Sequence, residues 1–402
     1  MYHSYGYLED GKDLRTFRFP PQLRRVPSQG VPVTEDQEAR VHALMNQYVM
    51  ISLHDHPTLV PEDIFELPDL IRQGRDFTGY EGLRASGLHV VFDNMLDGTS
   101  MITSHHGWKW DDVLYDLGMR FSDLAHQNTV RVIRRYHDIA AVKAAGQVGL
   151  VFAVEGGAPI EHELDRVDIL YGFGVRMMGL VYSESNALGS GLKEVRDGGL
   201  TQFGRAVVRR MNQLGMAIDV SHTGDRTALD AIACSDVPVF VTHAGARALW
   251  DTPRMKPDAV IQAIADKGGV FGIEAAPHTT LTAEYPRHCL DGVMQHFEYV
   301  ANLVGLEHVA FGPDTLFGDH AGLHQVFAQA MSLDTAQAGL SFPTVPYVDG
   351  LENPAEFPNI IRWLVVHGYR DADIAAVAGG NILRVLAQVW GEEGTTGLCR
   401  DN

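Results

Sequence analysis

Met216-Ala-Ile-Asp-Val-Ser-His222 and Val237-Pro-Val-Phe-Val-Thr-His243 are two short apolar runs, and each of them ends on a histidine. A parallel strand that is covered on both faces has this nearly continuous apolar character. Its last residue lies where the strand opens into a loop. Because the carboxyl ends of parallel barrel strands meet at one face, two such strands in succession predict a metal site there.

The same kind of run recurs along the chain and alternates with helical patterns. Strands are predicted over residues 49–57, 87–92, 148–157, 175–182, 216–222, 237–243, 270–274 and 308–314. Helices are predicted over residues 35–48, 121–147, 160–171, 201–214, 225–233, 258–267 and 290–304, with a closing helix pair over 371–390. Eight alternations without a composition break predict a (β/α)8 TIM barrel. A doubly wound sheet is the alternative, but the Gly-rich phosphate turn that it needs after an early strand is missing.

Two regions follow from this pattern. Residues 1–48 are expected to form an N-terminal arm and a helix packed on the barrel, and residues 49–402 the barrel with its C-terminal helices. The helix over 35–48 begins after Thr34, a favourable N-cap, and has an acidic first turn.

Composition narrows the choice of partners and compartment. The chain of 402 residues has a hydrophobic content of 45% and a formal net charge of −19, which argues against nucleic acid and anionic membranes as partners. Its three cysteines are widely spaced and form no disulfide framework. The N-terminus lacks the basic and apolar regions of a signal peptide, and no apolar run approaches membrane-spanning length. A cytoplasmic protein is therefore expected.

The first predicted strand ends in His54-Asp55-His56. Side chains two positions apart on a strand share a face and lie roughly 6.5–7 Å apart, so His54 and His56 can close on one metal ion. The strand over 148–154 ends on Glu155, a carboxylate that is costly to bury unless it is paired or bound to metal. The alternative is a glutamate that emerges into solvent.

Five of the eight strands thus end in residues that can bind metal or carry protons: His54 and His56, Glu155, His222, His243 and Asp314. Four histidines and a glutamate suit two zinc ions, with other divalent metals as alternatives. The expected chemistry is attack of metal-bound hydroxide on a polarised carbonyl. Asp314 is expected to take a proton from the nucleophile and deliver it to the leaving group. A Ser-His-Asp elbow, a phosphate loop and a thiolate zinc motif are all missing from the sequence.

A longer series of motifs resembles the renal (membrane) dipeptidase family of the amidohydrolase superfamily. It includes Gly198-Gly-Leu-Thr-Gln-Phe-Gly204, Ile218-Asp-Val-Ser-His222, Val241-Thr-His243-Ala-Gly-Ala-Arg-Ala-Leu249 and Pro253-Arg254, within a region from about His54 to Asn381. The resemblance implies a binuclear zinc barrel. It also implies roles for single residues: a bridging Glu155, His222 and His243 as ligands of one zinc and His54 of the other, Arg254 for the substrate carboxylate, and Asp314 as the catalytic aspartate.

The sequence departs from the family's pattern at three places. The family has His-x-Asp where this chain has His54-Asp55-His56, so an imidazole replaces a carboxylate. Tyr182 stands where the family has a histidine that contacts the scissile carbonyl; a phenol can donate a hydrogen bond but carries no imidazolium charge. The second aspartate of the family's Gly-x-Asp-x-Asp-Gly is absent from Gly312-Pro-Asp314-Thr-Leu-Phe-Gly318.

Together these residues predict hydrolysis of an amide-type bond in a small substrate that bears a carboxylate, such as a dipeptide. Two alternatives remain: an amidohydrolase relative acting on a lactam, ester, other amide or decarboxylation substrate, and a non-catalytic metal-binding barrel. Homo-oligomers are common for such barrels, and the sequence leaves the oligomeric state open. Residues 104–106, His320 and His324 are predicted to be surface loop residues, with a place at the barrel mouth as the alternative. The insert near Trp108 and Trp110 is a candidate lid or subunit contact, and Glu274 is predicted to be structural.

Overall fold

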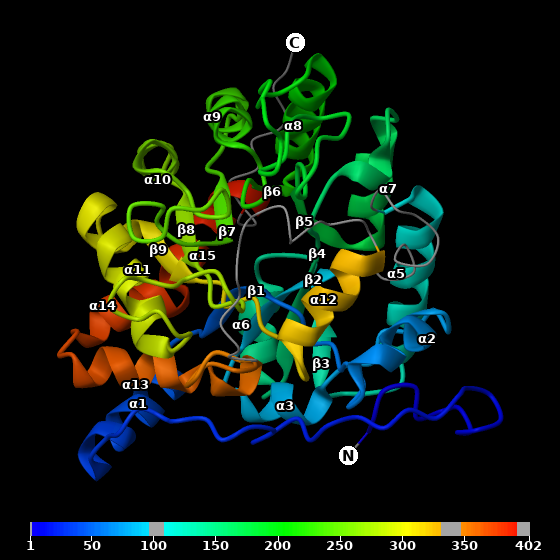
Figure 1. The fold of residues 1–402 in the computed structure, drawn as a ribbon, viewed down its shortest axis with the longest axis vertical. Coiled ribbons are helices and arrows are strands. Elements are labelled where there is room, and N and C mark those ends of the chain that lie inside the picture. The colour runs from blue at the N-terminus through cyan, green and yellow to red at the C-terminus, as the bar shows by residue number, and fades with distance from the viewer. Residues whose placement is uncertain (1, 96–107, 331–346, 392–402) are drawn as a thin grey trace.

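The computed structural model describes residues 2–95, 108–330 and 347–391 and contains a nearly closed parallel barrel (Figure 1). Eight strands follow one another around it in chain order, and each neighbouring pair is parallel. They are β1 (Ile51–Asp55), β2 (Val90–Met95), β4 (Val148–Val154), β5 (Val175–Gly179), β6 (Ala217–Asp219), β7 (Phe240–Ala244), β8 (Val270–Ile273) and β9 (Val309–Phe311). All eight predicted strands are present, and the predicted (β/α)8 fold is confirmed.

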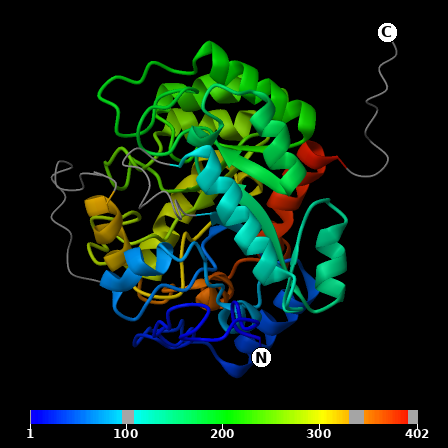
Figure 2. The same ribbon diagram turned by 90° about the vertical axis from the view of Figure 1, so that its right-hand side faces the viewer.

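Helices surround the barrel and cover its outer face (Figures 1 and 2). They are α1 (Glu35–Gln47), α2 (Leu67–Ile71), α3 (Tyr80–Ala85), α5 (Trp110–Leu124), α6 (Asp138–Ala144), α7 (Asp165–Phe173), α8 (Gln202–Leu214), α9 (Asp225–Cys234), α10 (Asp258–Asp266), α11 (Leu290–Val304), α12 (His320–Ala330), α13 (Pro358–Val366), α14 (Asp371–Ala375) and α15 (Asn381–Trp390). Thr34 caps α1 in a capping box with Gln37, as the sequence predicts for the start of this helix.

Hydrogen bonds between the segments that follow β1 and β9 close the barrel. The backbone N–H of Asp314 donates to the carbonyl of His54 at 2.9 Å, and that of His56 donates to the carbonyl of Thr315 at 2.8 Å. Both the N–H and the hydroxyl of Thr315 donate to the carboxylate of Asp55, at 2.8 and 2.7 Å. The first and last strands of the barrel therefore meet at the carboxyl end, where the predicted site residues lie.

The amino end of the barrel is covered by the C-terminal helices. In α15, Ile382, Val385 and Leu386 are fully buried and belong to the same apolar cluster as Leu53 and Phe240 of the strands. Between α14 and α15 the chain kinks at Gly379, where a Cβ atom would lie only 2.1 Å from the carbonyl oxygen of Val49. Only glycine allows the helix pair to approach the start of β1 this closely.

The N-terminal segment wraps the side of the barrel and is fixed by one buried carboxylate. Asp123 of α5 accepts hydrogen bonds from the hydroxyl of Tyr2 at 2.7 Å, the N–H of Tyr5 at 2.6 Å and the hydroxyl of Ser4. The hydroxyl of Tyr80 donates to the same carboxylate at 2.7 Å. Four donors keep the charge of Asp123 satisfied in a buried position.

The predicted helix over residues 121–147 is wrong. The chain instead ends α5 at Leu124, forms a short strand β3 (Val130–Val132) beside β4, and begins α6 at Asp138. The side-chain amide of Gln127 bonds to the carbonyls of Leu124 and Val130 and to the N–H groups of Thr129 and Val130, so it holds a turn at this point. The β-branched residues that follow favour a strand over a helix.

The segment Asp371–Trp390 is the one helical stretch among the described residues that is long and apolar enough, by length and composition, to cross a membrane. Its window has a mean hydropathy of 1.2, and half of the window is buried inside the protein. A core helix of a soluble protein passes the same test, so this is weak evidence. The kink at Gly379 divides the segment into two helices, and a pair of helices is what the sequence predicts for this region.

Candidate metal centre

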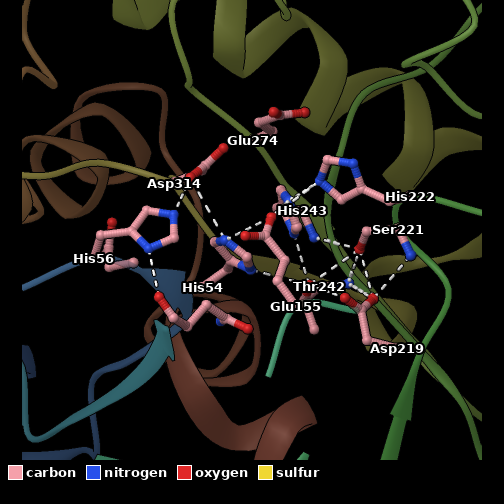
Figure 3. A network of polar contacts seen from close by, with 12 residues as sticks. His54, His56, Glu155, Asp219, Ser221, His222, Thr242, His243, Glu274 and Asp314 are labelled. Carbon is pink, nitrogen blue, oxygen red and sulfur yellow. Dashed lines mark hydrogen bonds and ion pairs between the residues drawn. The ribbon is translucent and has the colours of Figure 1, made fainter. Parts of the chain in front are cut away.

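The predicted ligands converge at the carboxyl end of the barrel (Figure 3). His54 lies on β1, Glu155 directly follows β4, and His243 lies on β7. His222 follows β6 in the loop before α9, and Asp314 follows β9. All five side chains are buried, although they come from positions far apart in the sequence. The structure thus brings together every metal-binding residue that the strand ends predict, including His56 just after β1.

Glu155, His222 and His243 form one side of the centre, referred to below as the Glu155 side. One carboxylate oxygen of Glu155 lies 3.0 Å from Nε2 of His222 and 3.3 Å from Nε2 of His243. The two Nε2 atoms lie 3.0 Å from each other. Burial lowers the pKa of both imidazoles well below the usual value, and the nearby Arg254 adds to this shift. Both rings are therefore neutral, which is the form that binds metal.

His56 and Asp314 form the other side, the Asp314 side. Nε2 of His56 lies 2.9 Å from Oδ1 of Asp314, and Nδ1 of His56 lies 2.6 Å from the carbonyl oxygen of Asn94. Burial acts to lower the pKa of His56, but the hydrogen bond and charge of Asp314 outweigh it and raise the pKa to about 9. Burial likewise acts to raise the pKa of Asp314, yet the neighbouring imidazoles of His54 and His56 hold it well below its usual range. This pair is charged.

His54 lies between the two sides. Its Nε2 atom is 3.6 Å from Glu155 and 3.5 Å from Asp314. This nitrogen is buried and makes no hydrogen bond within the described part of the chain. A buried nitrogen without a partner is costly, and a bound cation would satisfy it. Three overlapping sets of three residues could each hold an ion: His54, His56 and Glu155; His54, His243 and Asp314; Glu155, His222 and His243.

This donor set fits a divalent metal ion. Imidazole nitrogens and carboxylates converge in a buried space, and within each of the three sets the ligand atoms lie within 4.8 Å of one another. Imidazole and carboxylate ligands suit zinc and other first-row transition metals. His54, His56, Glu155, His222 and His243 are the residues that would hold the metal.

The sequence matches the profile of the membrane dipeptidase family (peptidase family M19) over residues 113–328 and 338–394. The chain belongs to this family. Among curated relatives, it is 29% identical to Dipeptidase aclJ of Aspergillus oryzae over 61% of this chain and 52% of the fungal protein, and 24% identical to human Dipeptidase 3 over 90% of this chain and 69% of the human protein. The matches to the three fungal dipeptidases span 52–63% of those proteins' lengths.

Solved structures show the same fold. An amidohydrolase from Pseudomonas aeruginosa is 25% identical and superposes with a TM-score of 0.73, covering 88% of this chain and 99% of that one. A metallopeptidase from Rhodobacter sphaeroides, solved with a phosphinate mimic of the dipeptide L-Ala-D-Ala, is 18% identical and superposes with a TM-score of 0.65 over 85% of this chain. The family assignment agrees with the resemblance that the sequence motifs indicate.

Arg254, the residue that the dipeptidase motif assigns to the substrate carboxylate, points to the centre from the loop after β7. Its Nη2 atom donates to Glu274 at 2.9 Å and to the carbonyl of His243 at 3.0 Å. Its Nη1 atom is buried and makes no hydrogen bond to any described residue. A guanidinium with one committed nitrogen and one uncommitted nitrogen is suited to bind an added carboxylate.

Glu274, which is predicted from the sequence to be structural, lies beside the predicted site residues. It follows β8, is 1% exposed and lies near Asp314 (Figure 3), and its carboxylate lies 2.9 Å from Nη2 of Arg254. Burial raises its pKa to about 8, with the charge of Arg254 opposing and that of Asp314 adding to the shift. The signal was present in the sequence: Val270-Phe-Gly-Ile-Glu274 is an apolar strand that ends on a carboxylate, as the strand before Glu155 does.

Tyr182 follows β5 and stacks on a metal-ligand candidate. Its ring centroid lies 4.3 Å from that of His222, with an angle of 19° between the planes. The residue that replaces the family's histidine is therefore placed beside the centre, where its phenol group can reach a substrate bound there.

The surface prediction for the later histidines is wrong for His320. This residue is buried as the first residue of α12, and its ring lies 4.5 Å from that of His324 one turn further on. Burial lowers the pKa of both, and both feel the charge of Asp314 and His56. The helix α12, which begins directly after the capping residue Asp319, brings them close to the metal centre. The other predicted surface histidines, His105 and His106, lie outside the described residues.

Proposed function

We propose that this chain is a binuclear, zinc-dependent hydrolase that cleaves the amide bond of a small substrate bearing a carboxylate, such as a dipeptide. The observation that carries the proposal is the convergence of four histidines on Glu155 and Asp314 within one buried site. Membership of the membrane dipeptidase family supports the same reaction class.

The two sides of the centre have different tasks in this proposal. His54, Glu155, His222 and His243, with His56, would hold the metal ions, and the Glu155 carboxylate lies within 3.6 Å of three of these imidazoles. When bound, a divalent metal pair lowers the pKa of a coordinated water and polarises a substrate carbonyl. Asp314 is ionised beside His56 and accepts the proton of the attacking water, then returns it to the leaving nitrogen.

Two residues position the substrate. Arg254 binds its carboxylate through the uncommitted Nη1 atom, and Glu274 keeps the guanidinium in place from the other side. The phenol group of Tyr182 donates a hydrogen bond to the carbonyl oxygen as negative charge develops there. A phenol does so without the positive charge of an imidazolium.

The departures at His56 and Tyr182 favour a second candidate, an amidohydrolase acting on a non-peptide amide, lactam or ester. His56 makes the Asp314 side less negative than a His-x-Asp motif would. This changes the charge that faces the leaving group. The pocket is therefore expected to prefer a different leaving group from that of a family member with the His-x-Asp motif.

A substrate panel at controlled metal loading tests the proposal. Purified protein is stripped with a chelator, reloaded with zinc, and offered L-L dipeptides, L-D dipeptides such as L-Ala-D-Ala, N-acyl amino acids, lactams and esters. We expect activity to disappear on stripping, to return with zinc at a metal-to-chain ratio of about two, and to be highest on a dipeptide. Hydrolysis of lactams or esters alone would favour the second candidate. Full activity in the stripped protein would refute a metal mechanism.

A further inference from the structure

Thr242 of β7 lies between His243, a residue of the Glu155 side, and His54, which stands between the two sides of the metal centre. Its hydroxyl oxygen is 2.7 Å from Nδ1 of His243 and 3.3 Å from Nδ1 of His54. The residue is fully buried, and the rings of His54 and His243 are close neighbours, with centroids 3.4 Å apart. One hydroxyl group therefore contacts the far nitrogen of both imidazoles.

The hydrogen-bond directions around this hydroxyl follow from Asp219 of β6. Four donors converge on the Asp219 carboxyl group: the N–H and hydroxyl of Ser221 at 2.9 and 2.6 Å, and the N–H and hydroxyl of Thr242 at 3.0 and 2.8 Å. A group that receives four donors acts as an acceptor only. The single proton of the Thr242 hydroxyl is thus directed at Asp219.

It follows that Thr242 presents only lone pairs to the two imidazoles. Each ring must then donate from Nδ1, so that its Nε2 atom carries a lone pair. In His243 this Nε2 atom faces Glu155, and in His54 it lies between Glu155 and Asp314 (Figure 3). Both Nε2 lone pairs would then be available to a metal ion.

The backbone at Thr242 is fixed as well. A Cβ atom on Gly272 would lie 1.9 Å from the carbonyl oxygen of Thr242, and one on Gly312 would lie 2.1 Å from it. The backbone at Gly272 and at Gly312 is thus in close contact with this peptide group, and a larger residue at either position would clash with it. Thr242 has little freedom to move away from the two rings.

We propose that Asp219 and Thr242 are positioning residues that set the Nδ1–H tautomer of His54 and His243 together, and so prepare two ligands of the centre before metal binds. This rests on the metal centre of the proposed function but not on its substrate. Partners of this kind change metal affinity by roughly 10–100-fold when they are lost, because they fix both the tautomer and the orientation of the ring.

The chain offers a matched control. Thr227 is also fully buried, and its hydroxyl donates to a carboxylate, Asp197, at 2.7 Å, but it does not contact the metal ligands. Zinc affinity is measured for each folded variant by competition with a chromophoric chelator. We expect Thr242→Val to lose roughly 10–100-fold in affinity, Thr242→Ser to retain wild-type affinity because it keeps the hydroxyl, and Thr227→Val to bind as the wild type does. Equal affinity in Thr242→Val, or equal losses in Thr242→Val and Thr227→Val, would overturn the proposal.

A second measurement needs no variant. In metal-free wild-type protein labelled with ¹⁵N-histidine, NMR correlations report which ring nitrogen carries the proton. We expect Nδ1–H for both His54 and His243, and an Nε2–H signal from either ring would contradict the proposal. Neither measurement uses peptide hydrolysis. If the dipeptidase assignment fails and the affinity and NMR results hold, the positioning role stands on its own.

Discussion

Both sides of the metal centre contain imidazole and carboxylate groups, but the imidazoles of the Glu155 side are neutral and the His56 imidazole of the Asp314 side is protonated. On the Glu155 side, His222 and His243 are neutral because burial dominates and Arg254 stands nearby. On the Asp314 side, His56 is equally buried but faces an ionised carboxylate at 2.9 Å, which raises its pKa to about 9. Burial alone does not decide the charge of a histidine. For His56, the hydrogen bond and the charge of Asp314 decide it.

Because of this difference in charge, we expect the two sides to have different roles in the reaction. The neutral imidazoles of the Glu155 side are ready to bind metal without losing a proton. On the Asp314 side, His56 is protonated and would release that proton on binding metal, whereas the ionised Asp314 is expected to accept a proton during turnover. Variants on the two sides should therefore fail in different ways, one through metal binding and the other through turnover.

The largest effect is expected for His222→Ala. This change removes one of three ligands around Glu155, so zinc affinity should fall by more than the roughly 10–100-fold that loss of an outer partner costs, and activity should be abolished. Metal analysis by mass spectrometry and a zinc titration check both. His126→Ala, at an exposed position, serves as the control and should bind zinc normally. A His222→Ala variant with undiminished zinc affinity would remove the Glu155 side from the metal centre.

Asp314→Asn should affect turnover instead. Loss of the carboxylate should reduce kcat by roughly 10²–10⁴-fold, while zinc bound on the Glu155 side remains. It also removes the group that raises the pKa of His56, so that pKa should fall. Steady-state kinetics and zinc analysis of one preparation separate the two effects. Loss of zinc in parallel with activity would show that Asp314 acts chiefly as a ligand, and the proposed division would then be wrong.

Tyr182→Phe should give a smaller loss. The phenylalanine ring keeps the stacking contact with His222 and lacks only the hydroxyl, so zinc content should not change. We expect kcat to fall by about 10²-fold, the lower end of the cost of removing one oxyanion donor. Unchanged kcat would mean that the phenol group has no part in the reaction and that the ring is only a packing partner of His222.

The last effect concerns stability rather than activity and involves Lys256, which is fully buried behind the Glu155 side and donates to the carbonyl of Thr223 at 2.7 Å. Burial lowers its pKa from 10.5 to about 7, with Arg254 adding to the shift. Between pH 7 and 10.5 the unfolded chain binds the proton and the folded chain does not. Stability should therefore rise with pH in this window, by at most about 1.4 kcal/mol per pH unit.

Lys256→Met tests this by removing the titrating group. Its free energy of unfolding, measured by denaturant titration at several pH values, should vary less between pH 7 and 10.5 than that of the wild type. Lys12→Met, at an exposed position, should leave the pH dependence intact. Parallel pH profiles for wild type and Lys256→Met would show that the lysine keeps an ordinary pKa in the fold.

The strands were predictable because buried parallel strands are continuous apolar runs, and five of them end on ligand-type residues. The residues that lie far from a strand end were harder to place. The helix α12 brings His320 into the site through tertiary packing that leaves no periodic signal, and Gln127 breaks a helix through side-chain bonds that propensity does not show. Asp219 and Thr242 lie inside two quoted motifs, but their role depends on distances between neighbouring strands.

The hydrogen bonds that join the segments after β1 and β9 also set an order in time. Asp55 and Thr315 are 260 residues apart, so the Asp314 side requires nearly the whole chain to have left the ribosome. The residues of the Glu155 side all lie between positions 155 and 243 and are synthesised earlier. The sequence of the Glu155 side is thus complete before Asp314 is synthesised, and Asp314 reaches its place only when the ends of β1 and β9 come together.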